Sequence, residues 1–356
     1  MSNKMGSLKQ KLFAKHWNQT AMFLLMFFLL IVLFFADILL GSVLIPVKQG
    51  LSALFFPSSV ADTTRTIIFD FRLPKAITAI FTGIALSVSG LLMQTVFRNP
   101  LAGPYVLGVS AGASLGVALF ALGFSSTLAW GIFSPSGAWS LALVAWIGAF
   151  LVMLLVMAVS VRVNDNMTIL ILGILFTSAA SAVVSILQYF SSEAMLKAFI
   201  VWTMGSLGGV TINQLSVLVP ATLVGAFLAF LKIKDLNAFL LGETYARSLG
   251  VNLMRSRLVI FFSASLLAGT ITAFCGPIGF IGIAVPHLAR VIFKTANHLV
   301  LIPAVILIGA NVMLLSDIIA QLPGFQATLP INSVTALLGI PVVVWMIVKN
   351  RKFTAV

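Results

Sequence analysis

Few side chains of this sequence could do acid-base, metal or nucleophilic chemistry, and those few are far apart. Asp37 and Asp317 are the main acidic groups inside long apolar segments, where a carboxylate can serve as a proton or sodium site. We interpret both as helix-end groups that reach water or cap a neighbour, with a proton relay as the alternative. The histidines and the single cysteine lack the spacing of metal ligands: they are His16, His287, His298 and Cys275. We therefore expect no catalytic cluster, metal, cofactor or disulfide.

Nucleotide chemistry is also missing from the sequence. A phosphate-binding loop of the P-loop type needs a Gly-Lys dipeptide, and none occurs in the 356 residues. The chain is therefore not expected to be an enzyme. Any ATP hydrolysis that drives it must take place in a partner.

One polar turn, at residues 98–102, lies between two apolar segments and reads Arg-Asn-Pro-Leu-Ala. Pro100 lacks a backbone donor and restrains Asn99 to an extended conformation. The turn can therefore project Asn99 and Leu101 sideways without continuing either helix. A simple connector is the alternative interpretation.

A second polar segment, near residues 232–257, favours two short helices joined by a turn. Glu243 and Arg247 have the i,i+4 spacing of an ion pair. Gly250 suits the end of the first helix, and Asn252 suits the N-cap of the next one. The sequence thus predicts a rigid, compact loop, with a solvated interfacial loop as the alternative.

The rest of the chain is that of an all-α polytopic membrane protein. Hydrophobic residues make up 60% of the sequence and charged residues 8%, which a soluble fold cannot accommodate. A helix needs about 20 apolar residues to cross a bilayer. Windows of that length predict about ten transmembrane helices, near residues 21–45, 76–96, 106–124, 139–160, 167–190, 216–231, 258–275, 278–292, 299–318 and 332–348.

The basic residues predict the orientation of these helices. With the N-terminus inside, all but five of the 21 Lys and Arg residues fall on cytoplasmic loops. The five left outside are Lys48, Arg65, Arg72, Lys75 and Lys197. We therefore expect both termini in the cytoplasm, an uncleaved first helix and one transmembrane domain over residues 1–356. This bias accounts for the net charge of +13 without nucleic acid.

Two other classes of membrane protein fit the composition. An ion-coupled secondary transporter normally carries charged groups at membrane depth, and their scarcity here disfavours that mechanism. A membrane-embedded enzyme would need clustered His, Asp or Glu side chains, which the sequence does not offer.

Several ordered motifs resemble the iron-siderophore, haem and vitamin B12 family of ABC importer permeases. They are the 98–102 turn, the Leu-Gly-Glu-x-x-Ala-Arg-x-Leu-Gly-Val-Asn segment at 241–252, the 280–290 segment and the 301–310 segment. The resemblance implies the permease subunit of a type II ABC importer in a bacterial cytoplasmic (inner) membrane. It also implies ABC ATPase subunits, an extracytoplasmic substrate-binding protein and a second permease copy, identical or paralogous. A ferric siderophore is the first expected substrate, with haem or a corrinoid behind it.

The resemblance also implies roles for particular residues. The polar segment near residues 232–257 would be the coupling loop, the loop that contacts the ATPase. Its contact residues would be Gly242, Glu243, Ala246, Arg247, Leu249, Gly250 and Asn252. The cytoplasmic gate would include Asn99 and Leu101, with a second part at Asn166, Met167 and Thr168. Arg72 and Lys75, in an Arg-Leu-Pro-Lys string, would dock the binding protein.

The sequence departs from the family pattern at two places on the expected outer face. Gln321 follows Ala320 where the family usually has a basic residue. Residues 328–332 read Thr-Leu-Pro-Ile-Asn where the family usually has Glu-Leu-Pro-x-Gly. Both departures bear on docking of the binding protein and leave the expected fold unchanged.

Overall fold

The computed structural model describes residues 2–41, 43, 45–56, 60–123, 138–162, 166–321 and 328–349. Within these residues the chain is built from helices and contains no β-strand. Seven helical segments are long and apolar enough to cross a membrane. They lie in α1 (Ser2–Leu39), the continuous run of α3 (Asp62–Thr66), η2 (Ile67–Arg72) and α4 (Leu73–Val96), α7 (Ala138–Arg162), α8 (Asn166–Phe190), α10 (Ile212–Leu231), α13 (Leu253–Cys275) and α15 (His298–Gln321).

Three shorter apolar helices occupy the places of the remaining expected spans: α5 (Val109–Gly123), α14 (Ile281–Phe293) and α16 (Ile331–Lys349). The other helical elements are α2 (Val47–Phe55), η3 (Pro104–Leu107), α9 (Glu193–Thr203), α11 (Ile233–Leu240) and α12 (Glu243–Ser248). All ten expected spans thus coincide with helices. Ten complete membrane crossings and the orientation of the termini stay predictions.

Several helix boundaries differ from those expected, and two of them bear on how α1 meets the helix that leads into α4. The second span was expected to begin near residue 76, but its helix begins at Asp62 and includes a π-helical stretch that ends at Arg72. The first span was expected to reach residue 45, whereas α1 ends at Leu39. There the Arg72 guanidinium donates to the carbonyls of Ile38 and Leu39, which have no intrahelical partner at a helix C-terminus.

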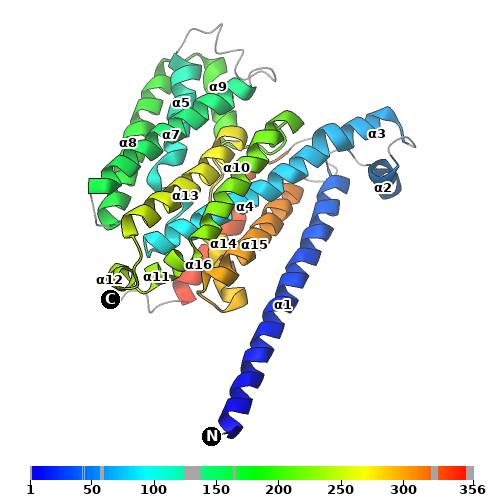
Figure 1. Ribbon diagram of the computed structural model, residues 1–356. Coiled ribbons are helices and arrows are strands. Elements are labelled where there is room, and N and C mark those ends of the chain that lie inside the picture. The colour runs from blue at the N-terminus through cyan, green and yellow to red at the C-terminus, as the bar shows by residue number, and fades with distance from the viewer. Residues whose placement is uncertain are drawn as a thin grey trace.

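Helix α4 is the centre of the packing. It contacts α15, α13, α14 and α10, and it is the most buried of the seven long segments. Figure 1 shows α4 running through the middle of the molecule, with α5, α7, α8 and α9 grouped on one side and α15 on the other. Helices α11 and α12 lie at the opposite end of the molecule from α2 and α3 (Figure 1).

Small residues let α4 approach its neighbours closely. A Cβ built at Gly83 would overlap the backbone of Gly309 in α15. A Cβ built at Gly90 would overlap the carbonyl of Gly282 in α14. Backbone therefore packs on backbone at both crossings, which is how membrane helices gain van der Waals contact without a hydrophobic driving force.

Replacing Gly90 by alanine is expected to destabilise the protein by about 2 kcal/mol, because the added methyl must displace the backbone of α14. Thermal unfolding of the purified protein in detergent measures the change. Gly209→Ala is the matched control, since a Cβ there meets nothing within 4 Å. Equal unfolding temperatures for the two variants would contradict the packing argument.

Candidate functional site

The expected coupling loop contains two short helices, α11 and α12, but the helix that Asn252 caps is the long α13 and not the second short helix that the sequence predicted. Gly242 joins them with a φ of 103°, and Gly250 follows α12 with a φ of 82°, a region that disfavours side chains with a Cβ. The Asn252 side chain accepts a hydrogen bond from the backbone N–H of Arg255 at 3.0 Å and so caps α13. The predicted caps at Gly250 and Asn252 are therefore confirmed.

One contact within this loop was assigned wrongly. The ion pair that Glu243 forms is with Arg257 of α13, whereas the sequence analysis paired it with Arg247. Arg257 is buried, and Arg247 is exposed. The pair with Arg257 joins the start of α12 to the first turns of α13.

The outward face of the loop is apolar. Leu241, Tyr245 and Leu249 are exposed by 62%, 66% and 65%, and we call these three residues the coupling patch. Ala246, on the opposite side of α12, is fully buried. The sequence analysis missed Leu241 and Tyr245. Exposed apolar side chains gathered on one loop are typical of a protein contact.

A carboxylate fastens α11 to the two long helices on either side of it. Asp235 accepts from Lys232 at 2.9 Å and from the Ser256 hydroxyl at 2.6 Å. Lys232 follows the last residue of α10, and Ser256 lies in α13. Asp235 thus links α11 to the end of α10 and to the first turns of α13.

A chain of hydrogen bonds continues from α11 to the C-terminal end of α4. Asn237 Oδ1 accepts from the backbone N–H of His298 at 2.9 Å and contacts His298 Nδ1 at 2.8 Å. Because a backbone N–H can only donate, the Asn237 atom is the carbonyl oxygen, and Nδ1 must carry a proton. His298 Nε2 contacts the Thr95 hydroxyl at 2.8 Å, and the single proton of that hydroxyl is shared between Nε2 and the Leu91 carbonyl, also at 2.8 Å. Asn237, His298 and Thr95 are named the relay below.

The 98–102 turn is held from two sides. The Asn99 side chain accepts from the backbone N–H of Leu101 at 2.9 Å, so the turn is closed locally. His287 Nε2 in α14 donates to the Pro100 carbonyl at 2.7 Å. Leu101 is 44% exposed and projects from the turn. Leu101 therefore projects as expected, whereas the Asn99 side chain folds back onto the turn, and the role of the turn as a gate stays a prediction.

The second expected gate segment lies on another element. Met167 and Thr168 are exposed in the first turn of α8, whereas Asn99 and Leu101 follow α4. Asn166 begins α8, and its side chain lies outside the described residues. The two gate segments thus belong to different helices of one chain.

At the N-terminal end of α4, the two expected docking residues make contacts within the chain. Arg72 is 6% exposed and donates to the carbonyls of Ile38, Leu39 and Val43. Lys75 forms an ion pair with Asp317 at 3.0 Å. Arg72 therefore serves the end of α1, and its burial does not fit a docking residue.

Gln321, which replaces the family's usual basic residue, joins both membrane aspartates. Its side-chain amide donates to Asp37 at 2.9 Å and to Asp317 at 3.0 Å. Both aspartates are buried and bind neighbouring side chains, so of the two expected roles, reaching water or capping a neighbour, the first does not hold for Asp37, and Asp317 borders a cavity beside Lys75. Together with Lys75 they form an internal polar cluster that ties α1, α4 and α15.

A cavity of about 530 Å³ opens between α5, α8, α9, the 277–280 segment and the start of α16. We call it the chamber. Six hydroxyl and amide side chains of α5 and α8 line it: Ser110, Ser114, Thr177, Ser181, Ser185 and Gln188. None of the described lining residues is charged. The sequence analysis did not single out these residues, although their spacing places them on one face of each helix.

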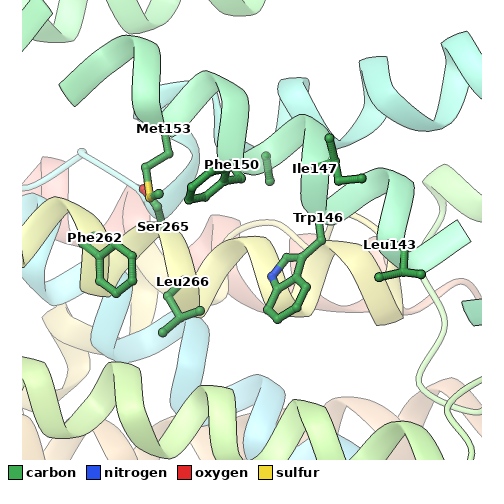
Figure 2. Close-up of a pocket in the computed structure, with 9 residues that line it drawn as sticks. Leu143, Trp146, Ile147, Phe150, Met153, Phe262, Ser265 and Leu266 are labelled. Carbon is green, nitrogen blue, oxygen red and sulfur yellow. The ribbon is translucent and has the colours of Figure 1, made fainter. Parts of the chain in front are cut away.

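Another cavity, of about 320 Å³, lies between α7 and α13 and is almost entirely apolar. Figure 2 shows Trp146, Phe150 and Met153 of α7 facing Phe262 and Leu266 of α13. Such a lining suits hydrocarbon and offers few partners to a polar substrate. The chamber is therefore the better candidate for a substrate pathway.

Comparison with known proteins places these features in a family. A family model described as the FecCD transport family matches residues 29–349. A protein described as an ABC transporter permease of Methanocaldococcus jannaschii is 32% identical over 348 residues, covering 94% of this chain and 98% of that protein. The vitamin B12 import system permease protein BtuC of Escherichia coli O9:H4 (strain HS) is 36% identical over 285 residues, covering 80% and 84%.

Solved structures agree with this placement. One, described as a metal-chelate type ABC transporter in an inward-facing conformation, has a TM-score of 0.80 and 30% identity over 93% of this chain and 99% of that chain. PsaBC from Streptococcus pneumoniae, solved with a Fab, has a TM-score of 0.53 and 16% identity over 80% and 94%, and supports the fold alone. The chain therefore belongs to the FecCD transport family, the membrane permease components of ABC transporters whose ATPase is a separate subunit.

Proposed function

We propose that this chain is the permease subunit of an ATP-driven importer that receives a metal chelate from an extracytoplasmic binding protein. The observation that carries the proposal is the rigid pair α11 and α12, which exposes the coupling patch in a chain without a nucleotide-binding loop. A partner that hydrolyses ATP can drive such a chain only through contacts that change with its state. The single domain of residues 1–356, the bacterial inner membrane and the pairing with a second permease copy belong to this proposal.

A ferric siderophore remains the first substrate proposed, with a corrinoid or haem as the other chelates. Similarity to a vitamin B12 import permease and to a metal-chelate type transporter supports the chelate class. An ion-coupled transporter is not favoured, because Asp317 is paired with Lys75 and both membrane aspartates share Gln321. A carboxylate engaged in this way is poorly placed to exchange an ion.

Reconstitution tests the proposal. The permease, the ATPase and the binding protein encoded nearest to it would be placed in proteoliposomes with a radiolabelled ferric chelate. Uptake should require ATP and should stop when the Walker lysine of the ATPase is replaced. Uptake driven by a proton gradient without the ATPase would contradict the proposal.

The proposed orientation predicts which loops an impermeant thiol reagent reaches in intact cells. In a background with Cys275→Ser, cysteine at position 65 or 197 should be labelled, because Arg65 and Lys197 are expected outside. Cysteine at position 247 should be labelled only after the membrane is permeabilised. Labelling of position 247 in intact cells would overturn the orientation.

Docking of the binding protein is predicted to depend on Lys75 and not on Arg72. The Lys75 side chain is the more exposed member of its ion pair, 16% against 6% for Asp317, and it borders a cavity. Lys75→Glu should therefore slow association of the binding protein about tenfold at low salt, through the encounter rate. Asp317→Asn removes the partner that holds Lys75 and should speed association. Association rates that are the same for the wild type and both variants would leave Lys75 with a purely structural role.

A further inference from the structure

Four side chains of the chamber are free to bind a ligand. Ser110 and Ser114 lie four residues apart on α5, and Ser181 and Gln188 lie seven residues apart on α8, so each pair shares a helix face. No hydrogen bond within the described part of the chain engages these four side chains. Hydroxyl and amide groups both donate and accept, so together they can serve ligand N–H and carbonyl groups alike.

The wall opposite these groups is held in place. The Tyr105 hydroxyl donates to the Ile278 carbonyl at 2.8 Å, and Asn332 Oδ1 accepts from the Gly279 N–H at 3.0 Å. Phe280 follows with a φ of 66°, a conformation that persists only where the surroundings fix it. A fixed wall loses little conformational entropy when a ligand binds, which favours binding.

Charge distinguishes the chamber from its neighbour. The chamber has no charged residue among those described in its lining. The adjoining cavity, of about 370 Å³ and bordered by Gly205 and Ile331, contains Lys75 and Asp317, but these pair with each other at 3.0 Å. A ligand with several negative charges would leave water for a site with no compensating cation, which is costly at membrane depth.

We propose that the chamber binds an uncharged metal chelate whose surface carries amide or hydroxamate groups, and that it discriminates against anionic chelates. This inference rests on the proposed importer function and deepens it by naming the substrate class. Ser110, Ser114, Ser181 and Gln188 hydrogen-bond the polar surface of the chelate. The Phe280 side chain and the ring of Tyr105 contact its apolar parts.

Protection of a cysteine in the chamber tests the proposal. Ser181→Cys is placed in a background with Cys275→Ser, in the permease–ATPase complex in lipid nanodiscs, and its rate of reaction with a maleimide is measured. The probes are a neutral ferric trihydroxamate, cobalamin, a triply anionic ferric tris-catecholate and haem. Neutral probes should slow labelling about tenfold, and anionic probes less than about twofold, at equal concentration. Ser114→Cys repeats the measurement from α5.

The probes also separate the two sources of an uncharged chelate. Protection by the trihydroxamate alone identifies a siderophore, and protection by cobalamin alone identifies a corrinoid; either supports the uncharged class. Equal or stronger protection by the tris-catecholate or haem overturns the proposal, as does no protection by any probe. Ile147→Cys, beside the apolar cavity of α7, is the control and should not be protected.

This experiment is independent of the test of the proposed function. Protection is measured without ATP and without the binding protein, whereas the importer proposal is tested by ATP-dependent uptake. A complex that imports an anionic chelate by ATP hydrolysis would refute the substrate class and leave the importer function intact. Protection of the chamber by neutral chelates, in a protein whose uptake is driven by an ion gradient, would support the substrate class and refute the ATP-driven importer function.

Discussion

Gly250→Val is expected to lower ATP-coupled uptake by about tenfold or more while leaving insertion into the membrane unchanged. Gly250 ends α12 in a Schellman arrangement, in which its N–H bonds the Arg247 carbonyl and the Val251 N–H bonds the Ala246 carbonyl, each at 3.0 Å. At its φ of 82° a side chain with a Cβ costs about 1–2 kcal/mol, and a β-branched one more. Relief of this strain would displace Leu249, which belongs to the coupling patch.

The effect of Gly250→Val can be separated from crowding. A Cβ at this position meets nothing within 4 Å, so the cost is conformational alone. Gly250→Asn is therefore the matched control, because asparagine tolerates the left-handed region better than valine. We expect Gly250→Asn to keep most of the uptake rate. Gly250→Val should lower the uptake rate by about tenfold or more and should no longer co-purify with the ATPase. Wild-type uptake and ATPase binding in Gly250→Val would remove the coupling assignment.

The local features of this loop were predictable because they depend on neighbours in the sequence. A glycine after one helix and an asparagine before the next determine the caps at Gly250 and Asn252. The partner of Glu243 was not predictable in the same way. Arg247 and Arg257 follow it on different helices, and the angle between α12 and α13 decides which guanidinium reaches the carboxylate.

The same distinction applies to the membrane helices. Their positions follow from hydropathy, and the close crossings of α4 follow from Gly83 and Gly90. The role of Arg72 did not follow, because a charged residue at a helix end is equally compatible with docking and with capping a neighbour. Only the fold shows that its donors meet the last carbonyls of α1.

The chamber was also beyond the sequence. Serine and threonine in an apolar helix often bond the carbonyl four residues earlier, as Thr177 and Ser185 do at 2.9 Å. The sequence does not distinguish these from Ser181, whose hydroxyl makes no hydrogen bond with the part of the chain that the structure describes. What makes Ser110, Ser114 and Ser181 a site is that α5 and α8 turn them toward one cavity.

His298→Leu is expected to uncouple ATP hydrolysis from transport. His298 is fully buried, and its two ring nitrogens join Asn237 of α11 to Thr95 of α4. Thr95 and His298 are 203 residues apart in the sequence. Leucine removes both ring contacts and leaves Asn237 Oδ1 with the backbone N–H alone, at a cost of about 1–3 kcal/mol. Because α4 leads directly into the 98–102 turn, a motion of α11 would then reach that turn more weakly.

The expected result is a fall of about tenfold in chelate imported per ATP hydrolysed, with ATPase binding retained, because the coupling patch is untouched. Leu299→Ala, at the next position of α15 and exposed by 62%, is the control and should leave the ratio unchanged. Asn237→Ala and His298→Leu should be no worse together than either alone, since residues that act as one chain are not additive. Additive losses in the double variant, or an unchanged ratio in His298→Leu, would contradict this role of the relay. The motion of α11 would then be passed to the 98–102 turn through α10 and α13, and the relay would only stabilise the packing of the helices.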